Sequence, residues 1–133
     1  MRVKNLLFGA VALAFCAQAM TGDSVALQFR GTWVPANASC ASPLRVEIEA
    51  NAVTFVNGPH RQVYRQLEQC FGCMGQGVQD TTLLTTDKMG DSPWQLYLNG
   101  AGKTPVVSAD LGGDKALAAK FPFHGGAALK KCR

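Results

Sequence analysis

The sequence predicts an all-β domain, an antiparallel meander of seven or eight short strands closed as a small barrel. Three observations predict it. Apolar residues recur at every second position, tight-turn residues separate the apolar runs, and no stretch has the periodicity of a helix long enough for a crossover. A β-sandwich is the alternative. The barrel is favoured because closure removes the exposed strand edges that recruit other chains.

The first two strands are expected close behind the N-terminal segment. Four apolar residues share one parity, namely Val25, Leu27, Phe29 and Trp33. In residues 44–49 apolar side chains then alternate with charged ones, which is the pattern of a half-buried strand.

A hairpin is expected next. Val53 and Phe55 continue the alternation up to Asn57-Gly58-Pro59, where Asn and Gly tolerate the positive φ of a tight turn. Its partner strand is expected over residues 60–67.

The second half of the chain repeats the scheme. Loops or turns are expected at 70–77, 87–93, 99–102 and 112–113, where Gly, Pro, Asn and Asp gather. Strands are expected over 78–85, 94–98 and 106–111. Residues 115–121 fit a strand or a short helix, and residues 127–131 fit a helical turn or a final strand.

Residues 1–19 have the pattern of a cleaved export signal. Arg2 and Lys4 precede an apolar run over residues 6–15, and Ala17-Gln18-Ala19 is the small-x-small pattern of a cleavage site. The run has about half of the ~20 residues that a membrane-spanning helix needs. We therefore expect a single β domain over residues 20–133, periplasmic or secreted, with no integral membrane segment after cleavage.

Charge argues against nucleic acid as a partner. The signal holds two of the thirteen basic residues and none of the nine acidic ones, so the net charge falls from +4 to +2 on cleavage. The remaining cations are scattered except for Lys130, Lys131 and Arg133, whereas a nucleic-acid groove needs clustered Lys and Arg.

Four cysteines remain after cleavage, and in an oxidising compartment they predict two disulfides: Cys40, Cys70, Cys73 and Cys132. Closing the short Cys70–Cys73 loop contributes roughly 2 kcal/mol, against roughly 3.5–4.5 kcal/mol for longer loops. This favours Cys70 and Cys73 each joined to Cys40 or Cys132. The alternative pairs Cys70 with Cys73 and Cys40 with Cys132.

No catalytic, metal or cofactor site is expected. His60 and His124 stand far apart in sequence, without carboxylates at ligand spacing, and Gly102-Lys103-Thr104 lacks the first glycine of a phosphate-binding loop. The chain is therefore expected not to be an enzyme. One alternative is a thiol–disulfide redox protein, because Cys70-Phe71-Gly72-Cys73 has the spacing of a redox dithiol.

The leading functional hypothesis is an exported binding module for a protein or other envelope component, plausibly an inhibitor or immunity-type protein. Loops carried by a rigid scaffold are common recognition sites, so the 70–77 loop is the candidate, with Phe71 and Met74 as apolar anchors. The oligomeric state is left open.

A carrier of a small apolar ligand is the second alternative. Gly31-Thr32-Trp33 resembles the Gly-x-Trp of lipocalin-type barrels, in which the tryptophan closes one end of the barrel. That resemblance implies an interior able to hold one small ligand. Trp33, Trp94 and Phe55 would line it.

Overall fold

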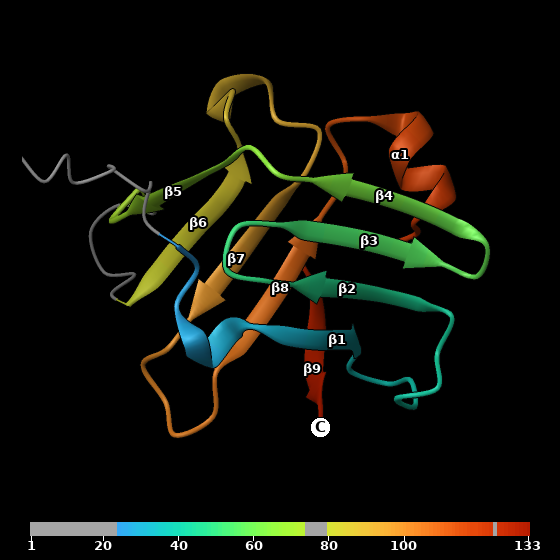
Figure 1. Ribbon diagram of the computed structural model, residues 1–133, viewed down its shortest axis with the longest axis horizontal. Coiled ribbons are helices and arrows are strands. Elements are labelled where there is room, and N and C mark those ends of the chain that lie inside the picture. The colour runs from blue at the N-terminus through green and yellow to red at the C-terminus, as the bar shows by residue number, and fades with distance from the viewer. Residues whose placement is uncertain (1–23, 74–79, 124) are drawn as a thin grey trace, which may run out of the picture.

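The computed structural model describes residues 24–73, 80–123 and 125–133 of the 133-residue chain. Within them the all-β prediction is confirmed (Figure 1). The export signal over residues 1–19 and the predicted anchor Met74 lie outside the described residues.

Nine strands form a single sheet. They are β1 (Gly31–Pro35), β2 (Leu44–Ile48), β3 (Val53–Asn57), β4 (His60–Tyr64), β5 (Leu67–Phe71), β6 (Thr81–Thr86), β7 (Gln95–Asn99), β8 (Val106–Asp110) and β9 (Ala127–Cys132). Two 3-10 turns, η1 (Leu27–Phe29) and η2 (Met89–Asp91), and one short helix, α1 (Lys115–Lys120), complete the described elements. In this part of the chain no helix has the length and apolar character needed to cross a membrane.

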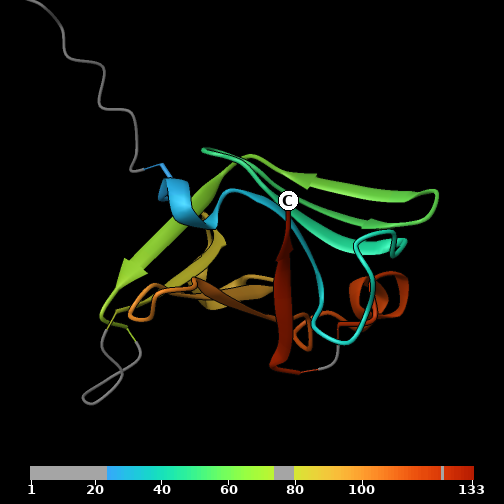
Figure 2. The same ribbon diagram turned by 90° about the horizontal axis from the view of Figure 1, so that it is seen from below.

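The sheet curls into a nearly closed barrel. Its order is β4-β3-β2-β1-β9-β8-β7-β6-β5, and every neighbouring pair is antiparallel. The two edge strands, β4 and β5, follow each other in sequence and are joined by Arg65-Gln66 alone. Figure 2 shows the result, with β1–β4 above, β6–β8 below, and β9 and β5 running between the two layers.

The strand count is nine rather than seven or eight because residues 60–71 form two strands. The first pairs with β3 and the second with β6, so the change of partner at Arg65-Gln66 divides the expected strand. Cys70 and Phe71 were expected in a loop, but they are the last two residues of β5. Two open assignments are also resolved, since residues 115–120 are helical and residues 127–132 form a strand.

The core lies between the two layers. Across one layer the register places Trp33 opposite Val46 and Val46 opposite Phe55, all fully buried. Across the other it places Leu84 opposite Leu96, which are equally buried. The period-two alternation in the sequence therefore marks the side chains that fill the interior.

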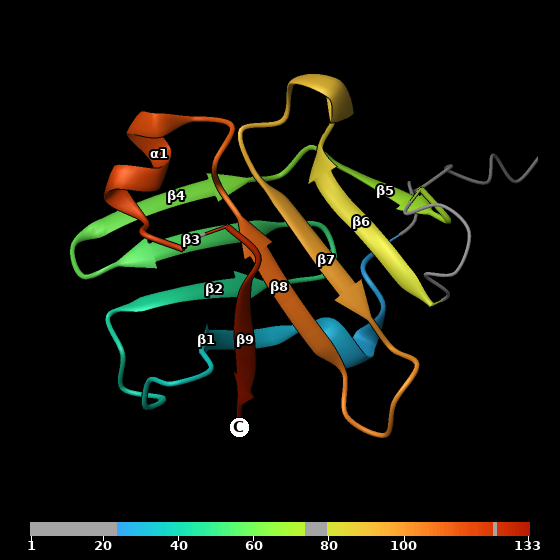
Figure 3. The ribbon, with the colours of Figure 1, turned by 180° about the vertical axis from the view of Figure 1, so that it is seen from behind.

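A helix closes one end of the barrel. Asp114 caps α1, its carboxylate accepting hydrogen bonds from the backbone N–H groups of Ala116 and Leu117 at 2.9 and 3.1 Å. Leu117 and Phe121 are buried against the core. Figure 3 shows α1 above β4, with η1 on the opposite side of the molecule.

Trp33 lies toward the η1 side. Its indole N–H donates to the Phe29 carbonyl at 2.8 Å, and Lys131 Nζ lies 6.0 Å from the centre of its ring. This tryptophan thus ties the η1 turn and the last strand to β1.

The predicted long-range pairing of Cys70 and Cys73 is wrong, and the alternative pairing is observed. Cys40 bonds Cys132 and Cys70 bonds Cys73, with Cα–Cα distances of 5.7 and 5.6 Å. The reason is topological, because β5 lies four places from β9 in the sheet.

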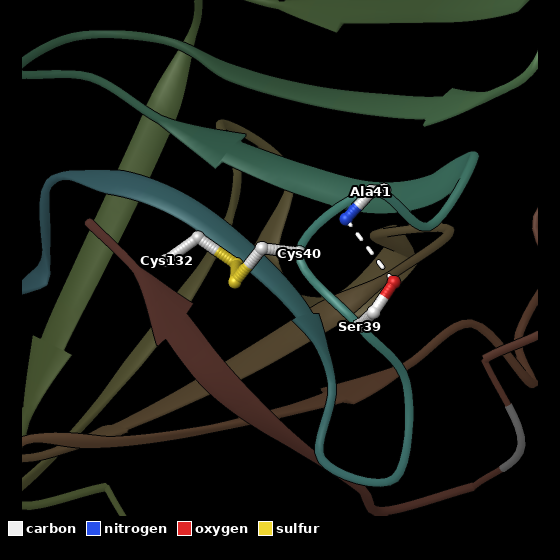
Figure 4. Close-up of a disulfide and its surroundings, with 4 residues drawn as sticks. All are labelled: Ser39, Cys40, Ala41 and Cys132. Carbon is white, nitrogen blue, oxygen red and sulfur yellow. Dashed lines mark hydrogen bonds between the residues drawn. A yellow bond between two sulfur atoms is a disulfide. The ribbon is translucent and has the colours of Figure 1, made fainter.

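The Cys40–Cys132 disulfide joins the β1–β2 connection to the end of β9 (Figure 4). Cys132 lies opposite Thr32 of β1 in the sheet, and the connection folds back over that position. Beside the disulfide, Ser39 Oγ accepts the Ala41 N–H at 3.3 Å and holds the turn.

Candidate functional site at the η1 end of the barrel

The predicted binding residues fall into two groups. Trp33, Phe55 and Trp94 are buried, at 0%, 0% and 1% exposure, whereas Phe71 is 66% exposed. The structure therefore separates the interior aromatic residues from the predicted surface anchor.

Phe71 belongs to the inward-facing row of β5 and yet reaches solvent. It lies opposite Thr82 of β6, which lies opposite the buried Leu98 of β7. Its exposure shows that the end of β5 extends beyond the packed core. A core-type side chain is thereby presented at the rim of the barrel.

A surface hollow of about 420 Å³, here called the Phe71 hollow, lies beside this ring. Its walls come from three places in the fold: residues 26, 28 and 29 around η1, the facing ends of β5 and β6 with Asp80, and Gly100 after β7. Asp80 has a φ of +61°, a conformation that Asp tolerates better than most residues. Its carbonyl accepts the Gly100 N–H at 3.2 Å, which fixes the two connections together.

Leu27 lies in η1, between two residues of the hollow wall in the sequence, and is the exposed residue that the sequence analysis missed. It is 76% exposed, although its parity placed it with the buried Val25 and Phe29. The η1 turn rotates it outward through two i→i+3 bonds, Phe29 N–H to Ala26 O and Arg30 N–H to Leu27 O. The η1 end therefore presents two large apolar side chains, Leu27 and Phe71.

The Cys70–Cys73 disulfide closes a ring around Phe71 and Gly72. Gly72 has a φ of +86°, which L side chains rarely adopt, so a glycine is needed where the chain turns back. The ring restrains the backbone on both sides of Phe71.

The interior aromatic residues pack against one another. The ring centres of Phe55 and Tyr64 each lie 5.4 Å from that of Trp94, both edge to face, and 6.0 Å from each other. The Trp94 indole N–H is buried without a hydrogen-bond acceptor, beside these two rings. Such packing is that of a core.

Tyr64 is the described residue whose titration is clearly displaced. Burial, followed by the negative charge of Asp114, raises the pKa of its hydroxyl above the ordinary value of 10.0. Elsewhere in the described ranges, no three His, Cys, Asp or Glu side chains come together as a metal site would require.

A comparison of this chain with protein families, curated proteins and solved structures finds no match. The strongest feature is the exposed side chain of Phe71 in the wall of the Phe71 hollow.

Proposed function

We propose that this chain is an exported, non-enzymatic binding module that contacts a partner protein at the cell envelope through its η1 end. It would act as an inhibitor or immunity-type protein does, by covering a surface of its partner. The observation that carries the proposal is the 66% exposure of Phe71 on the inward-facing row of β5.

An exposed phenylalanine on a restrained backbone suits an anchoring role. Burying such a side chain in a partner gains roughly 1.5–3 kcal/mol. Binding loses less conformational entropy when the backbone is already fixed, as the Cys70–Cys73 ring fixes it here. Interfaces draw much of their affinity from a few aromatic anchors of this kind.

The surroundings of Phe71 supply the polar rim of such an interface. Gln28, Asp80 and Thr82 line the hollow, and Leu27 in the η1 turn is a second exposed apolar side chain at this end of the barrel. An apolar centre with polar groups around it is the usual anatomy of a protein interface. The partner surface should therefore offer apolar contacts and a hydrogen-bond donor for the Asp80 carboxylate.

Export supports the envelope as the site of action. The pattern of residues 1–19 is that of an export signal, and disulfides such as Cys40–Cys132 persist in oxidising compartments.

Capture from envelope extract tests the proposal. The protein, recovered after export under its own residues 1–19, is immobilised and compared with Phe71→Ala and with Val106→Ala, a change at an exposed apolar residue on β8 that serves as the matched control. A specific partner should bind the wild type and Val106→Ala equally well. It should bind Phe71→Ala about 30-fold more weakly, which is the effect of losing an anchor worth about 2 kcal/mol. Equal capture by all three proteins would overturn the proposal.

Thiol–disulfide exchange is the second candidate function, favoured by the exposure of Cys73 in the Cys70–Cys73 disulfide. Equilibration with glutathione buffers distinguishes the two functions. A structural pair should have a reduction potential below about −300 mV, while an exchange-active pair lies at higher potential.

A further inference from the structure

The β4 edge of the sheet has no neighbouring strand. β4 pairs with β3 on one side, and the chain joins β6 only beyond Tyr64, where the Asp87 N–H donates to the Gln66 carbonyl at 3.1 Å. Beside β4 the wall of the barrel is therefore one strand short.

The hairpin register shows which backbone groups of β4 face this gap. Asn57 and His60 flank the two-residue turn and form a hydrogen-bonded pair, so hydrogen-bonded positions alternate from there along β4. Arg61 and Val63 consequently point their N–H and C=O groups away from β3. In the part of the chain that the structure describes, no backbone group bonds to them.

A groove lies along the C-terminal part of this edge. A groove of about 620 Å³ runs beside residues 63–66, and its opposite wall is formed by residues between 86 and 93 of the β6–β7 connection. From Arg61 to Arg65 an extended chain spans about 14 Å, the length over which a strand of about five residues would pair.

The outer face of β4 presents the row Arg61, Val63 and Arg65. Val63 is 37% exposed, and the Arg61 guanidinium shares the Glu47 carboxylate with Arg45, each at 3.2 Å. Arg65 forms no ion pair with any described residue. The β3–β4 hairpin itself contains no acidic residue.

We propose that the β4 edge binds an extended acidic segment of a partner protein as a tenth strand. Backbone hydrogen bonds to Arg61 and Val63 would supply affinity. The outer-face side chains of the added strand would read acidic, apolar, acidic, opposite Arg61, Val63 and Arg65. Asp87, Lys88 and Asp91 line the far wall and give it a net negative charge, so the acidic side chains belong on the outer face, away from that wall.

A second copy of this chain fits the edge less well than an acidic segment. Pairing β4 with β4 would bring Arg61 and Arg65 of one copy beside those of the other, and like charges opposed across a strand pair are destabilising. The proposed site is separate from the Phe71 hollow, so either can fail alone.

The test uses a fluorescein-labelled peptide, Thr-Glu-Thr-Val-Thr-Glu-Thr, and the same peptide with Lys in place of Glu. Fluorescence anisotropy should show saturable binding of the Glu peptide, weakened by salt because the charges are exposed. The Lys peptide should bind at least tenfold more weakly.

Two substitutions at one position isolate the backbone contact. Val63→Pro removes a backbone N–H that faces the gap and leaves the hydrogen bonds to β3 intact. It should therefore weaken binding of the Glu peptide about tenfold. Val63→Thr keeps the N–H and should change binding less than twofold. Phe71→Ala should not change it.

Arg65→Glu gives a second readout should Val63→Pro not fold, because Arg65 is exposed and lies outside the strand ladder. Arg65→Glu should weaken binding of the Glu peptide and strengthen binding of the Lys peptide. Unchanged binding in Arg65→Glu, equal binding of both peptides, or self-association of the chain lost in Val63→Pro would each overturn the proposal.

Discussion

At the scale of single residues, one residue type serves two roles according to its place along the barrel. Phe55 and Phe71 both belong to inward-facing rows, but Phe55 is fully buried at the centre while Phe71 is 66% exposed at the rim. Their contributions to stability and to binding should therefore be opposite.

Phe55→Ala should lower the free energy of unfolding by about 3–5 kcal/mol, because it leaves a cavity among the rings of Tyr64 and Trp94. Phe71→Ala should change it by no more than about 0.5 kcal/mol. Urea unfolding followed by tryptophan fluorescence measures both. A large loss in Phe71→Ala would mean that its ring is part of the core.

The raised pKa of Tyr64 predicts that the protein loses stability at high pH. Its folded pKa is raised above 10.0 by burial and by Asp114, so the folded state holds the proton more tightly than the unfolded state. The free energy of unfolding should therefore fall as the pH rises from about 10 through the folded pKa of Tyr64. Tyr64→Phe should remove this dependence.

The pKa of Tyr64 can be measured directly, because the chain has two tyrosines and Tyr97→Phe leaves Tyr64 as its only phenol. Titration of phenolate absorbance in that background should give a pKa above 10.0, lowered by Asp114→Asn. A pKa that does not respond to Asp114→Asn would contradict the assigned charge effect.

At the scale of elements, α1 depends on its capping residue. Asp114 accepts two backbone N–H groups, so Asp114→Ala should lower the free energy of unfolding by about 1 kcal/mol. Asp114→Asn caps almost as well and is the matched control. Thermal unfolding of both variants would show whether the cap, rather than the charge, stabilises the helix.

Elements with strong local patterns could be predicted from sequence. The alternation in residues 44–49 and the Asn57-Gly58-Pro59 turn gave β2 and the β3–β4 hairpin, because burial of one face and turn chemistry act locally. Residues 115–120 remained ambiguous, since a six-residue helix has too few turns to show a periodicity.

β5, η1 and the disulfide pairing could not be predicted, because each depends on distant residues. The β5 strand exists through its pairing with β6, which also lifts Cys70 and Phe71 out of the expected loop. The outward rotation of Leu27 depends on the η1 turn, which Trp33 helps to hold. Of the candidate site, Phe71 was identified, Leu27 was missed, and Met74 lies outside the described residues.

At the scale of the whole molecule, the two disulfides should differ in their effect on stability. Cys40–Cys132 spans 92 residues and Cys70–Cys73 spans three. Loop closure predicts losses of about 4.6 and about 1.9 kcal/mol for the paired Cys→Ser variants. Denaturant midpoints would measure them, and equal losses would contradict the assignment of a global and a local disulfide.

The barrel combines a packed interior with two open features, the Phe71 hollow at the η1 end and the unpaired β4 edge. The interior side chains fill the space between the layers, and we therefore propose that recognition takes place at the surface. The central claim is that Phe71 anchors a partner protein.

The most direct test of that claim is to measure, by calorimetry, the affinity of the captured and purified partner for the wild-type protein and for Phe71→Ala. Both proteins are compared under conditions in which they are fully folded. The account predicts a dissociation constant about 30-fold weaker for Phe71→Ala. A dissociation constant unchanged by Phe71→Ala would contradict it.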